Sequence, residues 1–329
     1  MTQNLDVLAI GNAIVDVIAD ADDAFLEREG LPRGSMRLID ADRAVELYER
    51  MGPGREISGG AAANTLAGLA NLGARTAFIG QVADDQLGAI YRHDLRAAGV
   101  QFDTPAREGE PPTGRCLILV SPDGERTMNT LLGASHYLPA AAIDEAMVAG
   151  AGILLLEGYL WDPPEPRAAM RRAIEIARGA GRKVALATCA DFCVHMHRAD
   201  FRSLINDGLI DMLFANEEEA GILEGSDPDA AIESLGRDVP LVVVTRGERG
   251  AVAIRGGERA EIRPEPIDRV VDATGAGDLF AAGFLYGLVE GRGLQDCLRI
   301  GAIAAAEVIS HYGARPEASL KALVAEKLG

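Results

Sequence analysis

Short apolar runs alternate along this chain with stretches whose apolar residues recur every three or four positions. The apolar runs are predicted strands, and several are apolar on both faces, as strands covered by helices on both sides must be; they span residues 5–10, 76–79, 152–156, 183–187, 211–215 and 241–245. Such alternation favours right-handed crossovers and a mostly parallel sheet. We therefore predict an α/β fold, a three-layer α/β/α sandwich.

The helical patterns lie between these runs, at residues 61–72, 86–98 and 167–178. A glycine follows each of them, Gly73, Gly99 and Gly179 respectively. We expect each glycine to end its helix in the left-handed conformation.

Two segments break the alternation of strand and helix. Residues 12–40 contain the strand-like stretches 14–18 and 36–39, and residues 113–131 are typical of a hairpin that turns at a Pro-Asp-Gly sequence. We predict a small β-sheet lid from these two segments (12–40 and 113–131) and a large α/β domain from residues 1–11, 41–112 and 132–329. The lid is expected to cover a cleft at the carboxyl ends of the strands, where open α/β sheets bind ligands.

Composition narrows the class of protein. The 329 residues are 48% apolar and carry a net charge of −18, so the surface repels nucleic acids and anionic membranes. No apolar run approaches the length of a membrane span, and the first residues, MTQNLDVLAIGN, lack the basic region of a signal peptide. The four cysteines show no CxxC spacing. Free thiols and a cytoplasmic location are expected.

Residues 272–278, with the sequence DATGAGD, are the most informative stretch, and an apolar helix follows them directly. The small residues Gly275, Ala276 and Gly277 allow backbone N–H groups to approach a ligand, and a helix start adds unpaired N–H groups and partial positive charge. This pattern predicts an anion site that suits a phosphate. Asp278 is expected to stay ionised there and to act as a general base in phosphoryl transfer to an alcohol. A tight turn that simply begins a buried helix is the alternative.

Residues in two further segments suit the recognition of a polyol. Gly59 and Gly60 allow close backbone approach, and Asn64 on the helix that follows can both donate to and accept from a hydroxyl. A flexible turn with a surface asparagine is the alternative. Asp16 shares a strand face with two isoleucines that should point inward, and a buried carboxylate needs partners such as a pair of hydroxyls.

The remaining motifs have ordinary structural explanations. Asn216 and Glu219 follow a predicted strand and have the spacing of a helix capping box. Thr245 and Gly247 end another predicted strand, as in many parallel sheets. A cluster of cysteine, aspartate and histidine at residues 189–197 matches no common structural zinc site, so packing is the simpler explanation.

Taken together, these motifs resemble the ribokinase (PfkB) family of sugar and nucleoside kinases. Residues 272–278 and the LFAAGF that follows resemble the C-terminal signature of the family, and the resemblance continues at residues 11–16, 59–64, 216–219 and 245–247. Ala273 departs from the family, which more often has Thr, Ser, Pro or Val there. The resemblance implies a ribokinase-like fold and transfer of the γ-phosphate of MgATP to a primary hydroxyl.

The resemblance also implies roles for individual residues. Asp16, assisted by Asn12, accepts the vicinal diol of the acceptor, whereas Asp278 is the general base. Arg126 on the lid hairpin approaches the transferring phosphate, so that closure of the lid completes a charge clamp. The residues implied to hold the sugar or ribose are Gly59, Gly60 and Asn64.

For the nucleotide, the resemblance implies that adenine lies between residues 245–247 and residues 302–306. Glu219 is expected to help hold Mg²⁺ through water, because Mg²⁺ keeps several waters. Residues 267–272 form the loop where relatives often bind K⁺. The residues implied to bind ATP are Asn216, Thr245, Gly247, Thr274, Gly275 and Gly277.

The acceptor is the least determined part of the prediction. Residues 125–129 (ERTMN) and 278–288 (DLFAAGFLYGL) are most similar to the adenosine kinases of the family. A nucleobase needs an apolar wall, for which Met36 and several aromatic residues are available, namely Phe25, Tyr159, Trp161 and Phe192. A ribose or ketohexose kinase and a pseudokinase that senses nucleosides remain alternatives. Monomer and homodimer, and ATP and GTP, also stay open.

Overall fold

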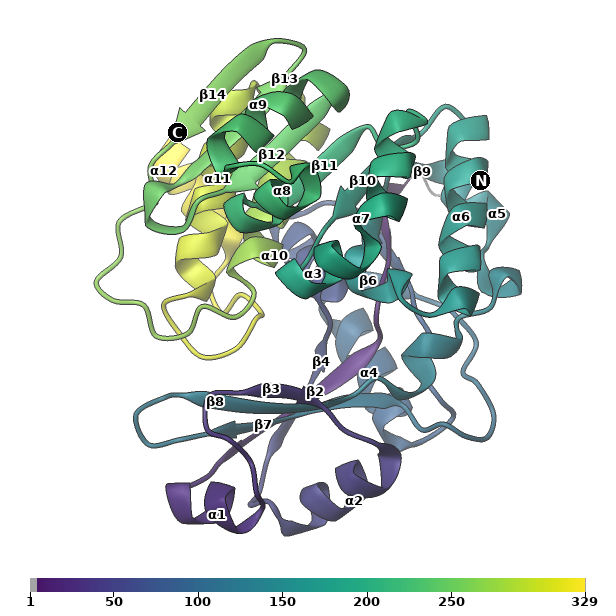
Figure 1. The fold of residues 1–329 in the computed structure, drawn as a ribbon, viewed down its shortest axis with the longest axis vertical. Coiled ribbons are helices and arrows are strands. Elements are labelled where there is room, and N and C mark those ends of the chain that lie inside the picture. The colour runs from purple at the N-terminus through teal and green to yellow at the C-terminus, as the bar shows by residue number, and fades with distance from the viewer. Residues whose placement is uncertain (1–4, 329) are drawn as a thin grey trace.

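The computed structural model describes residues 5–328, which form two β-sheets with helices around them (Figure 1). The strands of the larger sheet are β1 (Leu5–Ile10), β5 (Thr76–Ile79), β6 (Val100–Phe102), β9 (Ala151–Glu157), β10 (Lys183–Ala187), β11 (Met212–Asn216), β12 (Leu241–Thr245), β13 (Ala251–Arg255) and β14 (Glu258–Ile262). Their order is β14-β13-β12-β11-β10-β9-β1-β5-β6. In this order, the seven neighbouring strands from β12 through β9 and β1 to β6 pair in parallel, and β13 and β14 add an antiparallel edge.

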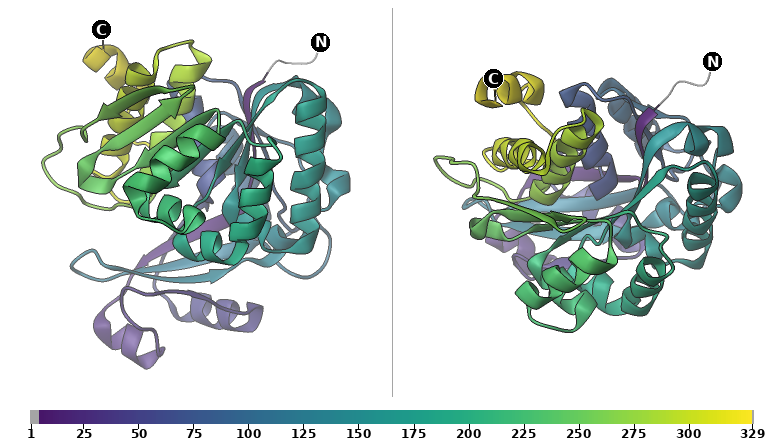
Figure 2. Two further views of the ribbon diagram at one scale, coloured as in Figure 1. Left: turned by 45° about the horizontal axis from the view of Figure 1, so that its top comes forward. Right: turned by 90° about the horizontal axis from the view of Figure 1, so that it is seen from above.

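Helices cover both faces of this sheet (Figure 2). One layer contains α3 (Ala61–Leu72), α4 (Gln86–Ala97), α10 (Ala276–Val289), α11 (Leu294–Val308) and α12 (Leu320–Leu328). The other contains α5 (Glu145–Gly150), α6 (Pro164–Gly179), α7 (Asp191–Asn206), α8 (Glu217–Glu224) and α9 (Pro228–Asp238). Val7 and Leu8, neighbours on β1, are both fully buried but lie in different layers. The predicted three-layer sandwich is confirmed.

The smaller sheet has the order β3-β8-β7-β2-β4 and lies beside the carboxyl ends of the main strands (Figure 1). Its strands are β2 (Ile14–Asp20), β3 (Met36–Leu38), β4 (Arg55–Gly59), β7 (Gly114–Val120) and β8 (Arg126–Leu131). Two helices, α1 (Asp23–Arg28) and α2 (Ala41–Arg50), lie on its outer side. The sheet therefore takes in β4, and α2 lies against it, although both segments were assigned above to the large domain. The domain boundaries themselves stay a prediction.

All the predicted strands form, and the three predicted helices form within a few residues of the expected bounds. Gly73 ends α3 with a φ of 107°, as expected. The prediction for Gly179 is wrong, because that residue is still helical and Gly181 takes the positive φ of 69° instead. Short 3₁₀ turns complete the structure: η1 (Gly133–Tyr137), η2 (Ala140–Ala142), η3 (Gly158–Trp161) and η4 (Gly247–Arg249). Among residues 5–328 we find no helix with both the length and the apolarity that crossing a membrane requires.

Candidate active site

The predicted base and the predicted acceptor-binding amide are in contact. Asp278 lies in the first turn of α10, and this helix begins directly after its cap residue Gly275, whose φ is 79°. Asn64 in the first turn of α3 donates a hydrogen bond from Nδ2 to Asp278 Oδ2 at 2.9 Å. A Cβ on Gly275 would lie 2.7 Å from the Cβ of Ala314, so the loop before α12 packs directly against this turn. Three distant segments therefore meet at the start of α10.

Asp278 is partly accessible rather than sealed in the core. Its side chain is half-buried, and its neighbour Gly277 is exposed, with no atom within 4 Å of the position of a Cβ. Burial raises the pKa of Asp278 to about 6, although the Asn64 hydrogen bond and the charge of Arg315 act in the opposite direction. Desolvation is the largest influence on this carboxyl, and it opposes the ionised form that the helix start was expected to favour. A pKa of about 6 still leaves the carboxylate mostly ionised at pH 7.

A pocket where the smaller sheet meets the large domain gathers predicted residues from four segments, Asp16, Asn64, Arg126 and Thr274. Residues 312–317, from the loop before α12, line the same pocket, and the sequence analysis did not single them out. Two predicted acceptor residues and two predicted phosphate residues therefore border one space, whereas Asp278 and Gly275 are not among its lining residues.

The glycines before α3 pack against other predicted site residues. A Cβ on Gly59 would lie 2.5 Å from Asp16 Oδ2, and a Cβ on Gly60, whose φ is 94°, would overlap the backbone carbonyl oxygen of Asn12. Glycine is therefore required here to admit Asn12 and Asp16. Burial raises the pKa of Asp16 to about 6, while Arg315 and Arg126 act to lower it.

Glu157, at the end of β9, is a buried carboxylate that the sequence analysis missed. It accepts hydrogen bonds from Asn12 Nδ2 at 2.7 Å, from the Asn12 backbone N–H at 3.2 Å and from the Ala62 backbone N–H at 2.9 Å. Burial raises its pKa to about 7. Glu157 therefore fixes the amide of Asn12 and joins the end of β1 to the start of α3. Its position at the end of an apolar run, LLLE, was the available signal.

Arg126 ties the smaller sheet to the turn before α10. Its Nη2 lies 2.5 Å from Asp272 Oδ2 in an ion pair whose side chains are 8% and 6% exposed, and its Nη1 donates to Thr274 Oγ1 at 3.3 Å. Asp272 also accepts from the Thr274 backbone N–H and hydroxyl and from the Gly313 backbone N–H, at 3.1, 2.7 and 2.8 Å. The predicted phosphate residue Arg126 is thus held at the edge of the turn that begins α10.

The predicted nucleotide residues lie at the carboxyl ends of neighbouring strands. Asn216 of β11 pairs with Thr245 of β12, and Gly247 begins η4 just beyond. Glu219 is buried in a complete capping box with Asn216 and also accepts from the Thr188 hydroxyl at 2.5 Å. Residues 5–328 hold no cluster of three or more His, Cys, Asp or Glu side chains placed to bind a metal. A role for Glu219 toward Mg²⁺ therefore remains a prediction.

Two of the four aromatic residues suggested for the nucleobase wall pack with the core instead. Trp161 is fully buried against Phe201, and Phe25 packs against the core beneath the outer side of the smaller sheet. Tyr159 and Phe192 do form a pair near the strand ends, with ring centroids 5.8 Å apart. Trp161 and Phe25 therefore contribute to core packing.

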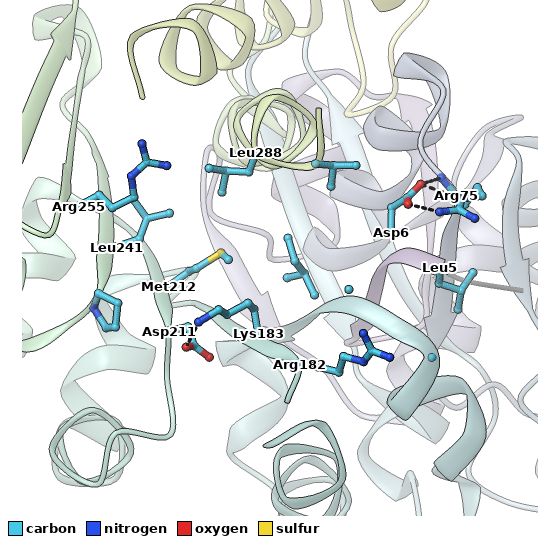
Figure 3. A pocket seen from close by; sticks show the side chains of 15 residues that line it. Leu5, Asp6, Arg75, Arg182, Lys183, Asp211, Met212, Leu241, Arg255 and Leu288 are labelled. Carbon is cyan, nitrogen blue, oxygen red and sulfur yellow. Dashed lines mark hydrogen bonds and ion pairs between the residues drawn. The ribbon is translucent and has the colours of Figure 1, made fainter. Parts of the chain in front are cut away.

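A wider pocket lies at the other end of the main sheet, at the amino ends of its strands (Figure 3). Two of its cations are neutralised by neighbours, because Arg75 pairs with Asp6 and Lys183 pairs with Asp211. None of the predicted site residues lines it. This pocket is therefore separate from the candidate site.

Comparison with known proteins now identifies the family. Residues 5–321 match the pfkB family carbohydrate kinase profile. The chain belongs to the pfkB family. It is therefore a phosphotransferase with an alcohol acceptor, and the ribokinase-like fold is confirmed.

Relatives of this pfkB protein act on different acceptors. Its structure is similar to adenosine kinase from Sinorhizobium meliloti, with 49% identity, a TM-score of 0.91 and coverage of 99% of this chain and 100% of that one. It is also similar to a probable sugar kinase from Rhizobium etli, with 45% identity, a TM-score of 0.92 and 99% coverage of both chains. A 5-dehydro-2-deoxygluconokinase from Shouchella clausii is 30% identical over 99% of this chain and 97% of its own length.

Proposed function

We propose that this pfkB protein is an adenosine kinase, which transfers the γ-phosphate of ATP to the primary hydroxyl of the nucleoside. The observation that carries the phosphoryl-transfer chemistry is the hydrogen bond from Asn64 to Asp278, which joins the acceptor-binding helix to the base. The similarity to the Sinorhizobium meliloti adenosine kinase supports the choice of acceptor.

The pairing of strands in the smaller sheet supports a nucleoside over a simple sugar. Cross-strand partners share a face, so the register from Asp16 through Cys116 and Thr130 places Leu38 on the same face as Asp16. Asp16 lines the candidate pocket, whereas Leu38 is 65% exposed and Met36 is 47% exposed. An exposed apolar strip beside a diol-binding carboxylate suits a base attached to ribose.

The chain's own groups divide the work of the reaction. Asp278 would take the proton of the acceptor hydroxyl as its oxygen attacks the γ-phosphorus and the bond from that phosphorus to ADP, the leaving group, breaks. The N–H groups at the start of α10, around Gly275 to Gly277, would face the charge that develops on the phosphoryl oxygens. Asp16 would hold the ribose diol, and Arg126 would add positive charge from the smaller sheet.

ATP is the co-substrate that membership of this family implies. A pocket between residues 265–269 and the Ile303 and Ala306 side chains of α11 lies beside the segment predicted to hold adenine. Mg²⁺, when bound, would neutralise charge on the phosphates, and it would be held mainly by phosphate oxygens and water, because the described residues offer no cage.

An assay of ADP formation over a panel of acceptors tests the proposal. Adenosine, inosine, ribose and fructose would each be supplied with MgATP, and we expect adenosine to give the highest kcat/KM. Turnover of ribose or fructose alone would favour the sugar kinase, a choice that the Rhizobium etli and Shouchella clausii relatives keep open. Acceptor-independent ADP release would contradict kinase activity toward all four compounds.

Truncation of the apolar strip should weaken the nucleoside specifically. We expect Leu38→Ala to raise the KM for adenosine about tenfold with little change in kcat, because the lost apolar contact stabilises substrate and transition state equally. Val45→Ala is the matched control, since Val45 is 47% exposed on α2, on the outer side of the same sheet. Steady-state kinetics gives the KM for adenosine of both variants. Equal KM values for Leu38→Ala and Val45→Ala would show that the apolar strip does not bind the acceptor.

The activity should depend on pH in the acid range. A base works only when ionised, and the pKa of Asp278 is raised to about 6, so kcat/KM should fall as the pH drops through 6 and level off above pH 7. Asp16, with its pKa also raised to about 6, should steepen the acid limb beyond tenfold per pH unit. A pH–rate profile with a midpoint near 4 would show that neither carboxylate is buried during turnover.

A further inference from the structure

Arg315 is the most heavily bonded polar side chain of the candidate pocket. Its Nε and Nη2 donate to the Ser58 carbonyl oxygen at 3.1 and 2.6 Å, and its Nη2 also donates to the Ser58 hydroxyl at 3.0 Å. Its Nη1 donates to the Ala63 carbonyl oxygen at 2.6 Å. A single guanidinium thus joins the loop before α12 to the segment that contains Gly59, Gly60 and the first turn of α3.

These contacts surround the acceptor side of the site. Ser58 is itself fixed, because its backbone N–H and hydroxyl donate to Asp94 Oδ2 at 2.7 and 2.6 Å. Ala63 precedes Asn64, the residue that donates to Asp278. Movement of the Arg315 guanidinium would therefore move both the glycine turn and the amide that contacts the base.

Arg315 also supplies positive charge where carboxylates are concentrated. It acts to lower the pKa of both Asp278 and Asp16, whose ionised forms burial disfavours. The titratable and charged groups whose charges interact with that of Asp278 are Asp16 of β2, Glu157 of β9, Tyr159 of η3, Cys189 after β10 and Arg315. Arg315 is the one permanent cation in this described set.

We propose that Arg315 is a positioning residue for phosphoryl transfer: it fixes residues 58–63 against the loop before α12 and provides positive charge at the pocket that it lines together with Asp16 and Asn64. The inference rests on the proposed kinase function. It assigns to the loop before α12 a part in acceptor binding, which the motifs of the sequence did not reveal.

Two substitutions separate the charge from the hydrogen bonds. Arg315→Gln removes the charge, so the acid limb of kcat/KM should move up by about one pH unit and the acceptor KM should rise about tenfold. Arg315→Lys keeps the charge but loses the fork of donors, so the acid limb should stay in place while the KM rises. The assay uses the full chain, MgATP and the best acceptor of the panel, between pH 5 and pH 8.

Arg167→Gln is the matched control for a merely structural arginine. Arg167 also donates to two backbone carbonyls, of Trp161 at 2.8 Å and of Asp162 at 2.9 Å, but it lies on α6. This variant should lower the unfolding temperature and leave both the acid limb and the acceptor KM unchanged.

The possible outcomes are distinct. A wild-type acid limb and KM in Arg315→Gln would overturn the inference, as would equal displacement of the limb in the Gln and Lys variants. If Arg315→Gln does not fold, the Lys variant decides: a raised KM with an unmoved limb supports the inference, and an unchanged KM overturns it. Inactive wild-type protein with every acceptor overturns the proposed function and this inference with it.

Discussion

Asp278→Asn is expected to lower kcat by roughly 10²- to 10⁴-fold, the range for loss of a general base. The new asparagine side chain has nearly the same shape as the carboxylate. Its amide oxygen can still accept the hydrogen bond that Asn64 Nδ2 donates to Asp278 Oδ2 at 2.9 Å in the wild type. It cannot take the proton of the acceptor. Acceptor binding, measured by calorimetry or by thermal shift, should therefore stay within a few-fold of the wild-type value.

The stability of this variant provides a second readout. The pKa of Asp278 is raised in the folded state, so the ionised side chain disfavours folding above pH 6, and this cost disappears when the group is neutral. Asp278→Asn should therefore unfold at the same temperature as the wild type or higher when measured at pH 8. A stable variant without turnover is the signature of a group kept for chemistry.

Asp211→Asn is the matched control, with the opposite expectation. Lys183 and Arg178 pair with Asp211 at 2.9 Å and help to lower its pKa, so its ionised form stabilises the fold above its unfolded-state pKa. This variant should lose stability at neutral pH and keep its kcat at a temperature where it is folded.

If Asp278→Asn retained kcat within tenfold of wild type, the assignment of the base would be wrong.

Local pattern was enough to predict six strands of the main sheet, but not β6, β13 and β14. Strands β1 and β10 to β12 are mainly apolar, because the sheet is covered on both faces, and such runs are visible without knowledge of the fold. Strand β4 was missed because its sequence, REISG, begins with charged residues and lies at the edge of the smaller sheet. An edge strand exposes one side, so its apolar signal is weak.

The site was predictable where its residues lie in one motif. The turn of residues 272–278 can be recognised by its glycines, and Asn64 can be recognised because it follows the pair Gly59 and Gly60. Arg315 and Glu157 could not be found in this way, because their roles depend on partners far along the chain, such as Ser58 for Arg315 and Asn12 for Glu157. Contacts of that kind are fixed by the tertiary fold and leave no periodicity in the sequence.

Gly277→Ala is expected to reduce kcat/KM for ATP roughly 10²- to 10³-fold, as does loss of an oxyanion donor. Nothing in the described structure lies within 4 Å of a Cβ at this position, so the methyl group has no steric clash with the protein itself. It would project into the space in front of the helix start, where the phosphoryl group must approach the N–H groups. Alanine also favours the helix over glycine, so the unfolding temperature should not fall.

Two other glycines separate ligand effects from folding effects in the same measurement. Gly179→Ala, at the end of α6, also meets no atom within 4 Å and should leave both kcat/KM and the unfolding temperature near wild type. Gly275→Ala should lose both, because its φ of 79° disfavours alanine and its Cβ would press on Ala314. Loss of activity without loss of stability is therefore expected at Gly277 alone among the three. Wild-type kinetics in Gly277→Ala would mean that the transferring phosphate does not approach the start of α10, and the anion-binding role of this turn would be excluded.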